Sequence, residues 1–328
     1  MIQYLFVYLN KNRSGGNEVF NKLNEFHKNS YSIYLLQNSK IKYAIFNLIK
    51  LLIKVYQLKN LSKNKILIAS DPFLCIAMGI FKIKYIRYVQ AIDEIILMNR
   101  INNFNYFIFK KIYKFTIYDG YICNSTFVSQ YLFNKYNVKS RAVVNPGTNF
   151  RYNQNIKKDF DLIFIIRKAP WKNCKFFIDI IQKKYLDKIK ILLINFDSVR
   201  VGIKESSNLS ILGPQSSAKM QDLFNMSKFY ISTTINEGYG LPALEAMACR
   251  CIPILPNNGG HNDFAYDEIN SFLYDLSNKN ALINLIKNCI SLNISEITKI
   301  QVNCETTAKN FSWDNFCKKF YKTIKDSN

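Results

Sequence analysis

The sequence predicts an α/β protein with two doubly wound domains, each a parallel sheet that carries helices on both faces. Short apolar runs of the β type alternate with longer segments of helical periodicity, which is typical of parallel sheets. Most of these runs are continuously apolar rather than alternating, as expected for strands that are covered on both faces. The runs form two series, and a chain of 328 residues is long enough for two domains.

The first series of expected strands lies at residues 2–8, 31–36, 66–69, 85–89, 121–124 and 142–145. The second series lies at residues 162–166, 189–194, 209–212, 229–232 and 252–255. Between them, Asn145-Pro146-Gly147 favours a turn, and residues 149–158 are polar without a clear period. We therefore expect two Rossmann-like domains at residues 1–150 and 151–310, and a C-terminal helix at 311–328 that packs back toward the first domain.

The net charge of +22 comes from 45 basic and 23 acidic side chains and is concentrated in the first half. Residues 1–150 hold 21 basic and 6 acidic side chains, a net charge of +15, whereas residues 151–328 hold 24 and 17, a net charge of +7. AT-rich coding accounts for part of the lysine excess, but it acts on both halves alike. Because Lys outnumbers Arg 37 to 8, we expect phosphates, nucleotides or an anionic membrane as partners rather than nucleic acid.

Eight cysteines are scattered without a C-x-x-C pair, and the chain has only two histidines, His27 and His261. No zinc template fits this set, so the cysteines are expected to be buried thiols in a reducing cytosol. Residues 2–9 lack the basic region and cleavage site of a signal peptide. The most apolar stretch, residues 43–58, is interrupted by four polar side chains, so no membrane-spanning helix is expected.

The most informative segment is residues 234–248, which follows the expected strand at 229–232. Gly238 and Gly240 allow a tight turn and a close approach of the backbone to a ligand, and Pro242 suits the first turn of a helix. The free amides and the dipole at the N-terminus of such a helix bind phosphate. The segment therefore predicts a strand, a glycine loop and a helix that together form an anion site.

Two glutamates flank this loop. Glu237 precedes it and Glu245 lies about one turn into the helix, so both can face the same pocket. Carboxylates beside a phosphate site accept hydrogen bonds from hydroxyl groups rather than bind the phosphate. A nucleotide sugar, in which polyols flank a diphosphate, satisfies both features. The alternative is a strand–turn–helix corner with two solvated glutamates.

The twelve residues from Glu237 read EGYGLPALEAMA and resemble the paired-glutamate E-x7-E motif of the retaining glycosyltransferases of family 4, which have the GT-B fold. Arg167 and Lys172 follow the strand at 162–166, as in that family. Further segments resemble the family at residues 125–147, 211–214, 257–260 and 311–313. The resemblance covers residues 120–328 with good motifs and is weaker before residue 120.

The resemblance implies catalytic roles for Glu237, Arg167 and Lys172. The two cations would bind the donor diphosphate, which gains negative charge as the glycosidic bond breaks. Glu237 would contact hydroxyls of the transferred sugar, and Glu245 would accept hydrogen bonds from the ribose. The alternative for the two cations is a pair of surface side chains after a strand. The remaining donor-binding positions are Gly238, Tyr239, Gly240 and Leu241.

Four residues of the first domain are expected to contact the acceptor or the sugar. Gly15 and Gly16 approximate the glycine loop of the family's first domain, with an ordinary loop as the alternative. Gln90 and Asp93 stand where many members place a His, with a loop in which Asp93 caps a helix as the alternative. In the second domain, Arg250 replaces the usual family Gly, so the backbone at that helix end departs from the family pattern.

No metal and no cofactor are expected, since Arg and Lys supply the positive charge at the diphosphate. Asp159 and Asp161 match the D-x-D metal motif of the other glycosyltransferase fold, but they precede a strand and are interpreted as a polar strand entrance. His261 follows Gly259 and Gly260 and is expected in a surface loop, with a contact to the donor pocket as the alternative.

Segment 40–65 carries seven Lys and no acidic residue. A narrow polar stripe at three- and four-residue spacing runs along its apolar helix and consists of Asn47, Lys50, Lys54 and Gln57. Packing against a sheet explains such a helix, but the Lys-rich flanks also suit an anionic membrane surface. The same holds for residues 104–114, where aromatic residues lie beside lysines.

We therefore expect a hexosyltransferase-type retaining glycosyltransferase that uses a nucleotide-sugar donor of the UDP or GDP type and a glycan or lipid-linked acceptor. AT-rich coding and the basic first domain favour bacterial surface polysaccharide or lipopolysaccharide assembly, at the cytoplasmic face of the inner membrane. Two alternatives are another GT-B enzyme, such as a phosphorylase or an epimerase, and a basic scaffold that binds membranes or nucleic acid. The paired-glutamate loop disfavours an epimerase.

Overall fold

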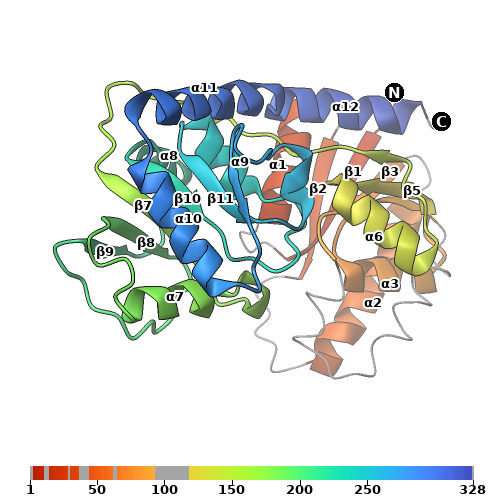
Figure 1. Ribbon diagram of the computed structural model, residues 1–328. Helices are drawn as coiled ribbons and strands as arrows, with labels where there is room; N and C mark the ends of the chain where they lie inside the picture. The colour runs from red at the N-terminus through yellow and green to blue at the C-terminus, as the bar shows by residue number, and fades with distance from the viewer. Residues whose placement is uncertain are drawn as a thin grey trace. The chain divides into compact units, whose positions relative to one another are not determined.

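The computed structural model describes residues 3–10, 15–28, 30–36, 44–61, 65–92 and 118–326. The chain divides into two compact units, Met1–Pro146 together with Trp313–Asn328, and Gly147–Ser312. Each unit holds its own six-stranded parallel sheet with helices packed on it (Figure 1). The α/β class with two parallel sheets, predicted from the sequence, is therefore confirmed.

The sheet of the first unit has the strand order β2-β1-β3-β4-β5-β6, and all neighbouring strands in it are parallel. Its strands are β1 (Gln3–Asn10), β2 (Ser30–Leu36), β3 (Lys65–Ala69), β4 (Tyr85–Val89), β5 (Tyr118–Cys123) and β6 (Ala142–Val143). All five residues of β4 are buried, as expected for a strand that is covered on both faces.

The helices of the first unit are α1 (Gly15–Phe26), α2 (Ala44–Leu61), α3 (Pro72–Ile80), α6 (Thr126–Tyr136) and α12 (Trp313–Lys325). The buried side chains of α12 recur every three or four positions, which gives it one apolar face. The Tyr321 hydroxyl donates a hydrogen bond to the Leu23 carbonyl of α1 at 2.7 Å, and its ring lies 4.8 Å from that of Tyr4 in β1. The C-terminal helix is thus part of the first unit.

The sheet of the second unit has the order β12-β11-β10-β7-β8-β9 and is also parallel. Its strands are β7 (Phe160–Ile166), β8 (Ile191–Asn195), β9 (Leu209–Leu212), β10 (Ser227–Ile231), β11 (Ile252–Pro256) and β12 (Phe272–Tyr274). The edge strand β12, with three residues, was not predicted from the sequence.

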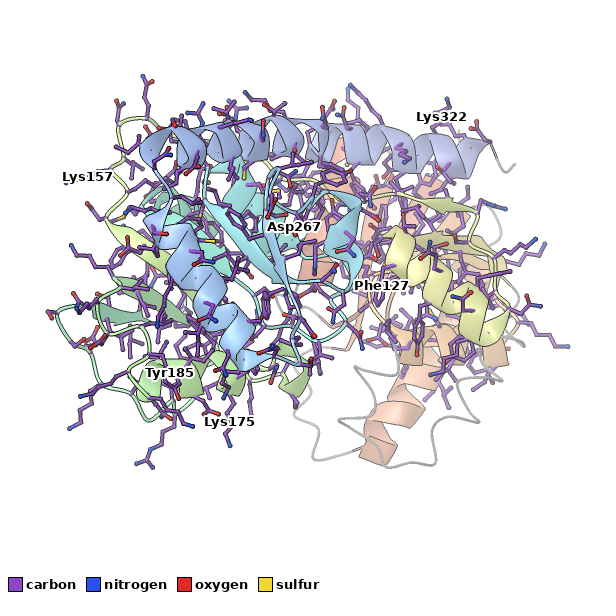
Figure 2. All side chains as sticks on the ribbon, in the orientation of Figure 1. Phe127, Lys157, Lys175, Tyr185, Asp267 and Lys322 are labelled. Carbon is purple, nitrogen blue, oxygen red and sulfur yellow. The ribbon has the colours of Figure 1, made fainter. Side chains whose placement is uncertain are left out.

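The helices of the second unit are α7 (Cys174–Gln182), α8 (Ser217–Asn225), α9 (Leu241–Ala248), α10 (Lys279–Ser291) and α11 (Ile294–Asn310), with 3-10 turns η3 (Pro170–Lys172) and η4 (Gly260–Asp263). The helix α9 packs against α8 and α11. Charged side chains point outward from the helices, as Lys175 on α7 and Lys322 on α12 illustrate (Figure 2). Among the described residues, no helix combines the length and the apolar character that a membrane span needs.

Candidate active site

The strand order of the second unit determines where a ligand site can form. From β7 the chain moves outward through β8 and β9, and it then returns to place β10 on the other side of β7. At such a switch point the two loops diverge at the carboxyl ends of the strands, where open α/β sheets bind their ligands. Arg167 and Lys172 follow β7, and Glu237 follows β10. The strand order therefore places all three after the two strands that flank the switch point.

Hydrogen bonds tie the loops after β7 and β10 together. The Ile235 amide donates to the Trp171 carbonyl at 2.8 Å. The Thr233 hydroxyl donates to the carbonyls of Lys172 at 3.0 Å and Asn173 at 3.1 Å. Because these contacts fix the backbone around η3, Lys172 is held beside the loop that carries Glu237.

Lys172 and Glu237 form a direct ion pair, with Nζ and Oε2 2.6 Å apart. Their side chains are 27% and 18% exposed, so the pair is largely withdrawn from water. Burial raises the pKa of the Glu237 carboxyl, but Lys172, helped by a hydrogen bond from Thr234, outweighs burial and lowers this pKa below its ordinary value. Glu237 is therefore ionised at neutral pH and can only accept hydrogen bonds.

Two glycines allow the Glu237 loop to pack against the turn after β11. Gly240 has φ +91°, and a Cβ there would lie 3.2 Å from the Cβ of His261. Gly259 has φ +110°, and a Cβ there would lie 2.7 Å from the Glu237 carbonyl oxygen. That oxygen accepts a hydrogen bond from the Gly260 amide at 2.7 Å. The turn after β11 thus positions the backbone of Glu237, and a side chain at either glycine would force the turns apart.

The predicted strand, glycine loop and helix are confirmed, since α9 begins directly after Gly240. Tyr239 turns its side chain into the core, where it is 3% exposed and its ring centroid lies 5.2 Å from that of Phe264. Burial raises the pKa of the Tyr239 hydroxyl well above its ordinary value. Tyr239 can therefore offer a ligand only its backbone, while Glu245 lies half-buried one turn further along α9.

Arg167 has a different partner. Its Nε donates to Oδ2 of Asp197 at 3.0 Å, and the same oxygen accepts from the Lys168 amide at 2.7 Å. Burial raises the pKa of the Asp197 carboxyl, but the bonds from Lys168 and Arg167 outweigh burial and lower it. Asp197 was not predicted as a site residue, because only the pairing of β8 with β7 brings it beside Arg167. Arg167 and Lys172, both expected at the donor diphosphate, thus each have their own carboxylate partner, Asp197 and Glu237.

The prediction that His261 lies in a surface loop is wrong, because its side chain is only 2% exposed. Its Nε2 lies 2.7 Å from the Pro256 carbonyl oxygen, which can only accept, so Nε2 carries the proton. Burial lowers the pKa of the ring, against the opposing effects of Pro256, Glu237 and Asp263. His261 is therefore a neutral, buried support for the turn that holds Glu237.

The candidate residues of the first unit are only partly described. Gly15 and Gly16 begin α1 rather than form a separate loop. The Gln90 amide donates to the Ser70 hydroxyl at 3.1 Å, and the Gln90 carbonyl accepts from Asn124 Nδ2 at 2.7 Å. These bonds connect the carboxyl ends of β3, β4 and β5. Asp93 and residues 104–114 lie outside the described residues.

Asp159 and Asp161 lie at the amino end of β7, which agrees with their interpretation as a polar entrance to this strand. Asp161 Oδ1 accepts from Lys228 Nζ at 2.9 Å, and its Oδ2 accepts from the Lys190 amide at 3.0 Å. Among the residues that the structure describes, no group of three or more His, Cys, Asp or Glu side chains could hold a metal ion.

Arg250 adopts the left-handed conformation that glycine favours, with φ +54°. Its side chain compensates for this conformation by two contacts. Its Nε donates to Glu305 Oε2 at 2.7 Å, and its guanidinium lies 4.1 Å from the centroid of the Tyr152 ring. The backbone after α9 therefore adopts the conformation that glycine favours, although Arg250 stands where the family usually has Gly.

Comparisons with known proteins agree with this architecture. Residues 148–311 match the family described as "Glycosyl transferases group 1". An uncharacterized glycosyltransferase of Methanocaldococcus jannaschii is 28% identical over 263 residues, which cover 74% of this chain and 70% of that protein. The solved structure of sucrose-phosphate synthase from Thermosynechococcus elongatus superposes with a TM-score of 0.81 at 13% identity, over 99% of both chains. That of Anabaena HepE in complex with UDP-glucose gives 0.77 at 13% identity, also over 99% of both chains.

The family match spans half of the chain and includes both loops that build the Lys172–Glu237 pair. The structural neighbours are glycosyltransferases of the GT-B fold, with two Rossmann-like domains, and they share this arrangement of two parallel sheets. The chain therefore belongs to the group 1 family of glycosyl transferases and is a transferase of the GT-B fold.

Proposed function

We propose that this glycosyltransferase acts with retention, as a member of family 4, and moves a hexose from a nucleotide-sugar donor to a glycan or lipid-linked acceptor. The observation that carries the proposal is the Lys172–Glu237 pair beside the glycine loop at the switch point. A sugar nucleotide needs cations for its diphosphate and carboxylates for its hydroxyls, side by side. The pair offers one of each at 2.6 Å.

In this proposal Lys172 and Arg167 bind the donor diphosphate. As the bond between the anomeric carbon and the phosphate oxygen breaks, the leaving diphosphate gains negative charge, and fixed cations stabilise it. Asp197 would hold the Arg167 guanidinium by its Nε, which leaves the remaining N–H groups of the fork to donate to phosphate. These two cations take the place of a metal ion, so no metal and no cofactor is proposed.

Glu237 and Glu245 are assigned to the two polyol parts of the donor. Glu237 precedes the helix and is held as an ionised acceptor by Lys172, which suits hydroxyls of the transferred sugar. Glu245 lies one turn into α9, which suits the ribose. The backbone amides from Gly238 to Leu241 would lie between them, at the positive end of the α9 dipole.

For retention, the acceptor oxygen would attack the anomeric carbon from the face that the diphosphate leaves. A new carbon–oxygen bond replaces the bond to phosphate, and the acceptor proton passes to a phosphate oxygen. No separate protein base is needed for this step. UDP or GDP sugars are proposed as donors, and the UDP-glucose complex of the structural neighbour HepE supports the UDP class. Gly15, Gly16, Gln90 and Asp93 are the proposed contacts to the acceptor or the sugar.

A peripheral contact with an anionic membrane is also proposed, in keeping with a role in bacterial surface polysaccharide or lipopolysaccharide assembly at the cytoplasmic face of the inner membrane. Ile53 and Tyr56 of α2 are 56% and 57% exposed, and Ile80 of α3 is 62% exposed. The Tyr56 ring contacts that of Phe81, which joins the two helices. Neither helix contains an acidic residue, and exposed lysines follow them at positions 82 and 84. Apolar anchors among lysines suit the surface of anionic lipids.

The test is a thermal-shift panel of UDP, GDP, ADP and CMP sugars, because a ligand that binds only the native state raises the unfolding midpoint. One donor class should stabilise the wild type, and Lys172→Ala should lose that shift. Lys175→Ala is the matched control, since Lys175 is an exposed lysine on α7 (Figure 2). An equal shift in Lys172→Ala and in the wild type would refute the site. The absence of a shift with all four donor classes would refute the donor class.

A further inference from the structure

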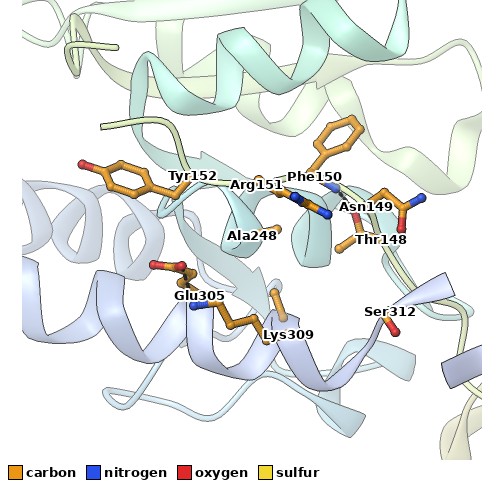
Figure 3. A pocket seen from close by; sticks show the side chains of 10 residues that line it. Thr148, Asn149, Phe150, Arg151, Tyr152, Ala248, Glu305, Lys309 and Ser312 are labelled. Carbon is orange, nitrogen blue, oxygen red and sulfur yellow. Dashed lines mark hydrogen bonds and ion pairs between the residues drawn. The ribbon is translucent and has the colours of Figure 1, made fainter. Parts of the chain in front are cut away.

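A cavity of about 440 Å³ lies in the second unit, lined by Thr148, Asn149, Phe150, Arg151, Tyr152, Ala248, Glu305, Ala308, Lys309 and Ser312 (Figure 3). Its size falls within the range of small-molecule sites, about 300–1,000 Å³. Ala248 is the last residue of α9, whereas the glycine loop precedes the first, Leu241. Eight residues of helix separate the two ends by about 12 Å, so this cavity is distinct from the donor site.

The charges around the cavity are unequal. Arg151 and Lys309 line it, and Arg250 stands behind Glu305, the one acidic lining residue. Glu305 Oε2 accepts from Arg250 Nε at 2.7 Å, and Glu305 Oε1 lies 2.7 Å from Lys309 Nζ. Burial raises the pKa of the Glu305 carboxyl, but these two cations outweigh burial and lower it, so the carboxylate is ionised and shared. The charged lining residues Arg151, Lys309 and Glu305 give a net charge of +1, and Arg250 adds a further positive charge behind Glu305.

Arg151 is a lining residue whose guanidinium is available to a ligand. It is exposed, and its guanidinium makes no hydrogen bond or ion pair with any residue in the described part of the chain; only its backbone groups are engaged. Figure 3 shows it on the wall opposite α11, from which Lys309 extends. Lys309 is 70% exposed, so beside its bond to Glu305 its ammonium keeps N–H groups that can donate to a ligand. A guanidinium and an ammonium on facing walls form a clamp for a tetrahedral dianion.

The remaining polar lining consists of short side chains with hydrogen-bonding groups. Thr148 Oγ1 accepts from the Phe150 amide at 3.1 Å, which leaves its proton to donate, and Asn149 and Ser312 also line the cavity. These groups suit hydroxyls rather than an extended apolar ligand. We propose that the cavity binds a small phosphomonoester that carries hydroxyl groups, with its phosphate between Arg151 and Lys309 and its hydroxyls on Thr148, Asn149 and Ser312.

Calorimetric titration with glycerol 3-phosphate tests this proposal, because that probe combines a phosphate with two hydroxyl groups. Arg151→Ala and Lys309→Ala should each weaken binding about tenfold, the loss of one charge-assisted contact. Glu305→Gln should tighten binding, because it removes the only negative charge of the lining. A gain of affinity in this variant cannot arise from damaged folding.

Two controls separate this site from other surfaces. Lys299→Ala removes an exposed lysine of the same helix outside the cavity and should leave the affinity unchanged. Lys172→Ala should also leave it unchanged, because Lys172 belongs to the proposed donor site. Loss of glycerol 3-phosphate binding in Lys172→Ala with retention in Arg151→Ala would overturn the proposal by assigning the phosphate to the donor site. Wild-type protein that does not bind the probe, or a Glu305→Gln variant that binds it more weakly, would also overturn the proposal.

Discussion

Replacing Glu237 by Gln tests the central feature of the site, because it removes the charge and keeps the shape of the side chain. The transferred sugar gains positive charge as its bond to phosphate breaks. If Glu237 binds hydroxyls of that sugar, its carboxylate stabilises the transition state more than it stabilises the bound donor. Removing one such preorganised electrostatic contact lowers turnover by about 10²–10³-fold. Affinity for free nucleoside diphosphate should stay at the wild-type level, because Lys172 keeps its charge and the free nucleoside diphosphate lacks the sugar to which Glu237 is assigned.

The same substitution has a stability effect with a defined pH dependence. A hydrogen bond to a charged group contributes about 1.5–3 kcal/mol, and the glutamine oxygen still accepts from Lys172, so we expect a loss of about 1 kcal/mol at neutral pH. The folded-state pKa of Glu237 lies below its unfolded value. Its stabilising contribution is therefore complete above the unfolded pKa and disappears as the pH falls through the folded pKa. The difference between wild type and variant should shrink as the pH falls below about 4.3.

Three measurements test the effects of Glu237→Gln. Initial rates with the donor identified by thermal shift measure turnover, and calorimetry measures the affinity for nucleoside diphosphate. Unfolding midpoints between neutral and acidic pH measure the stability. Wild-type turnover in Glu237→Gln would contradict the catalytic role. A loss of nucleoside diphosphate affinity with unchanged turnover would reverse the roles of Glu237 and Glu245. A stability difference that does not change with pH would show that Lys172 does not hold the carboxylate in its ionised form.

Glu245→Gln should weaken nucleoside diphosphate binding by about 1–2 kcal/mol in calorimetry, because the ribose loses a charged acceptor; equal affinity would remove its role. Transfer should persist in excess EDTA, and activity that EDTA abolishes and Mg²⁺ restores would contradict the metal-free mechanism. Lys54→Glu combined with Lys59→Glu should reduce co-sedimentation with anionic liposomes but not with neutral ones, since lysine–lipid attraction is electrostatic; unchanged sedimentation would refute the electrostatic contact. Gly240→Ala should lower the unfolding midpoint, since φ +91° disfavours an L side chain by about 1–2 kcal/mol and the added Cβ would lie 3.2 Å from His261; a wild-type midpoint would show that the turns can separate freely.

The parallel sheets could be predicted because their strands are buried on both faces, which makes them continuous apolar runs. β12 could not be predicted, because three residues at a sheet edge give no periodic signal. The strand β4 could be predicted although it contains the charged residue Arg87, because the residues on both sides of Arg87 are apolar. That Arg87 itself is wholly buried could not be predicted from its charge.

The glycine loop could be predicted because its signal is local: two glycines, a proline and two glutamates in one short segment. The Arg167–Asp197 pair and the burial of His261 could not, because both depend on which strands lie side by side. Gly-Gly-His-Asn-Asp in isolation is typical of an exposed turn. Only the packing of this turn onto Glu237, through Gly259 and the Gly260 amide, places His261 inside.

The spacing between the two glutamates is fixed by contacts at both ends of α9. At its N-terminal end, Gly240 packs on the turn after β11, which also holds the Glu237 carbonyl. At its C-terminal end, the half-buried Lys158 donates to the Cys249 carbonyl at 3.0 Å and to the carbonyls of Phe224 and Ser227. Burial lowers the pKa of Lys158, yet these three acceptors match the three protons of its ammonium group.

Because α9 is held at both ends, Glu245 cannot shift along the helix axis without breaking either the glycine contact or the Lys158 contacts. Glu237 is held separately, by Lys172 on its side chain and by Gly260 on its backbone. The two carboxylates are thus positioned by different elements, the first by the turns after β7 and β11 and the second by α9. The geometry of the two carboxylates therefore depends on contacts between distant segments of the second unit, which is why a local sequence motif could indicate the site but not its geometry.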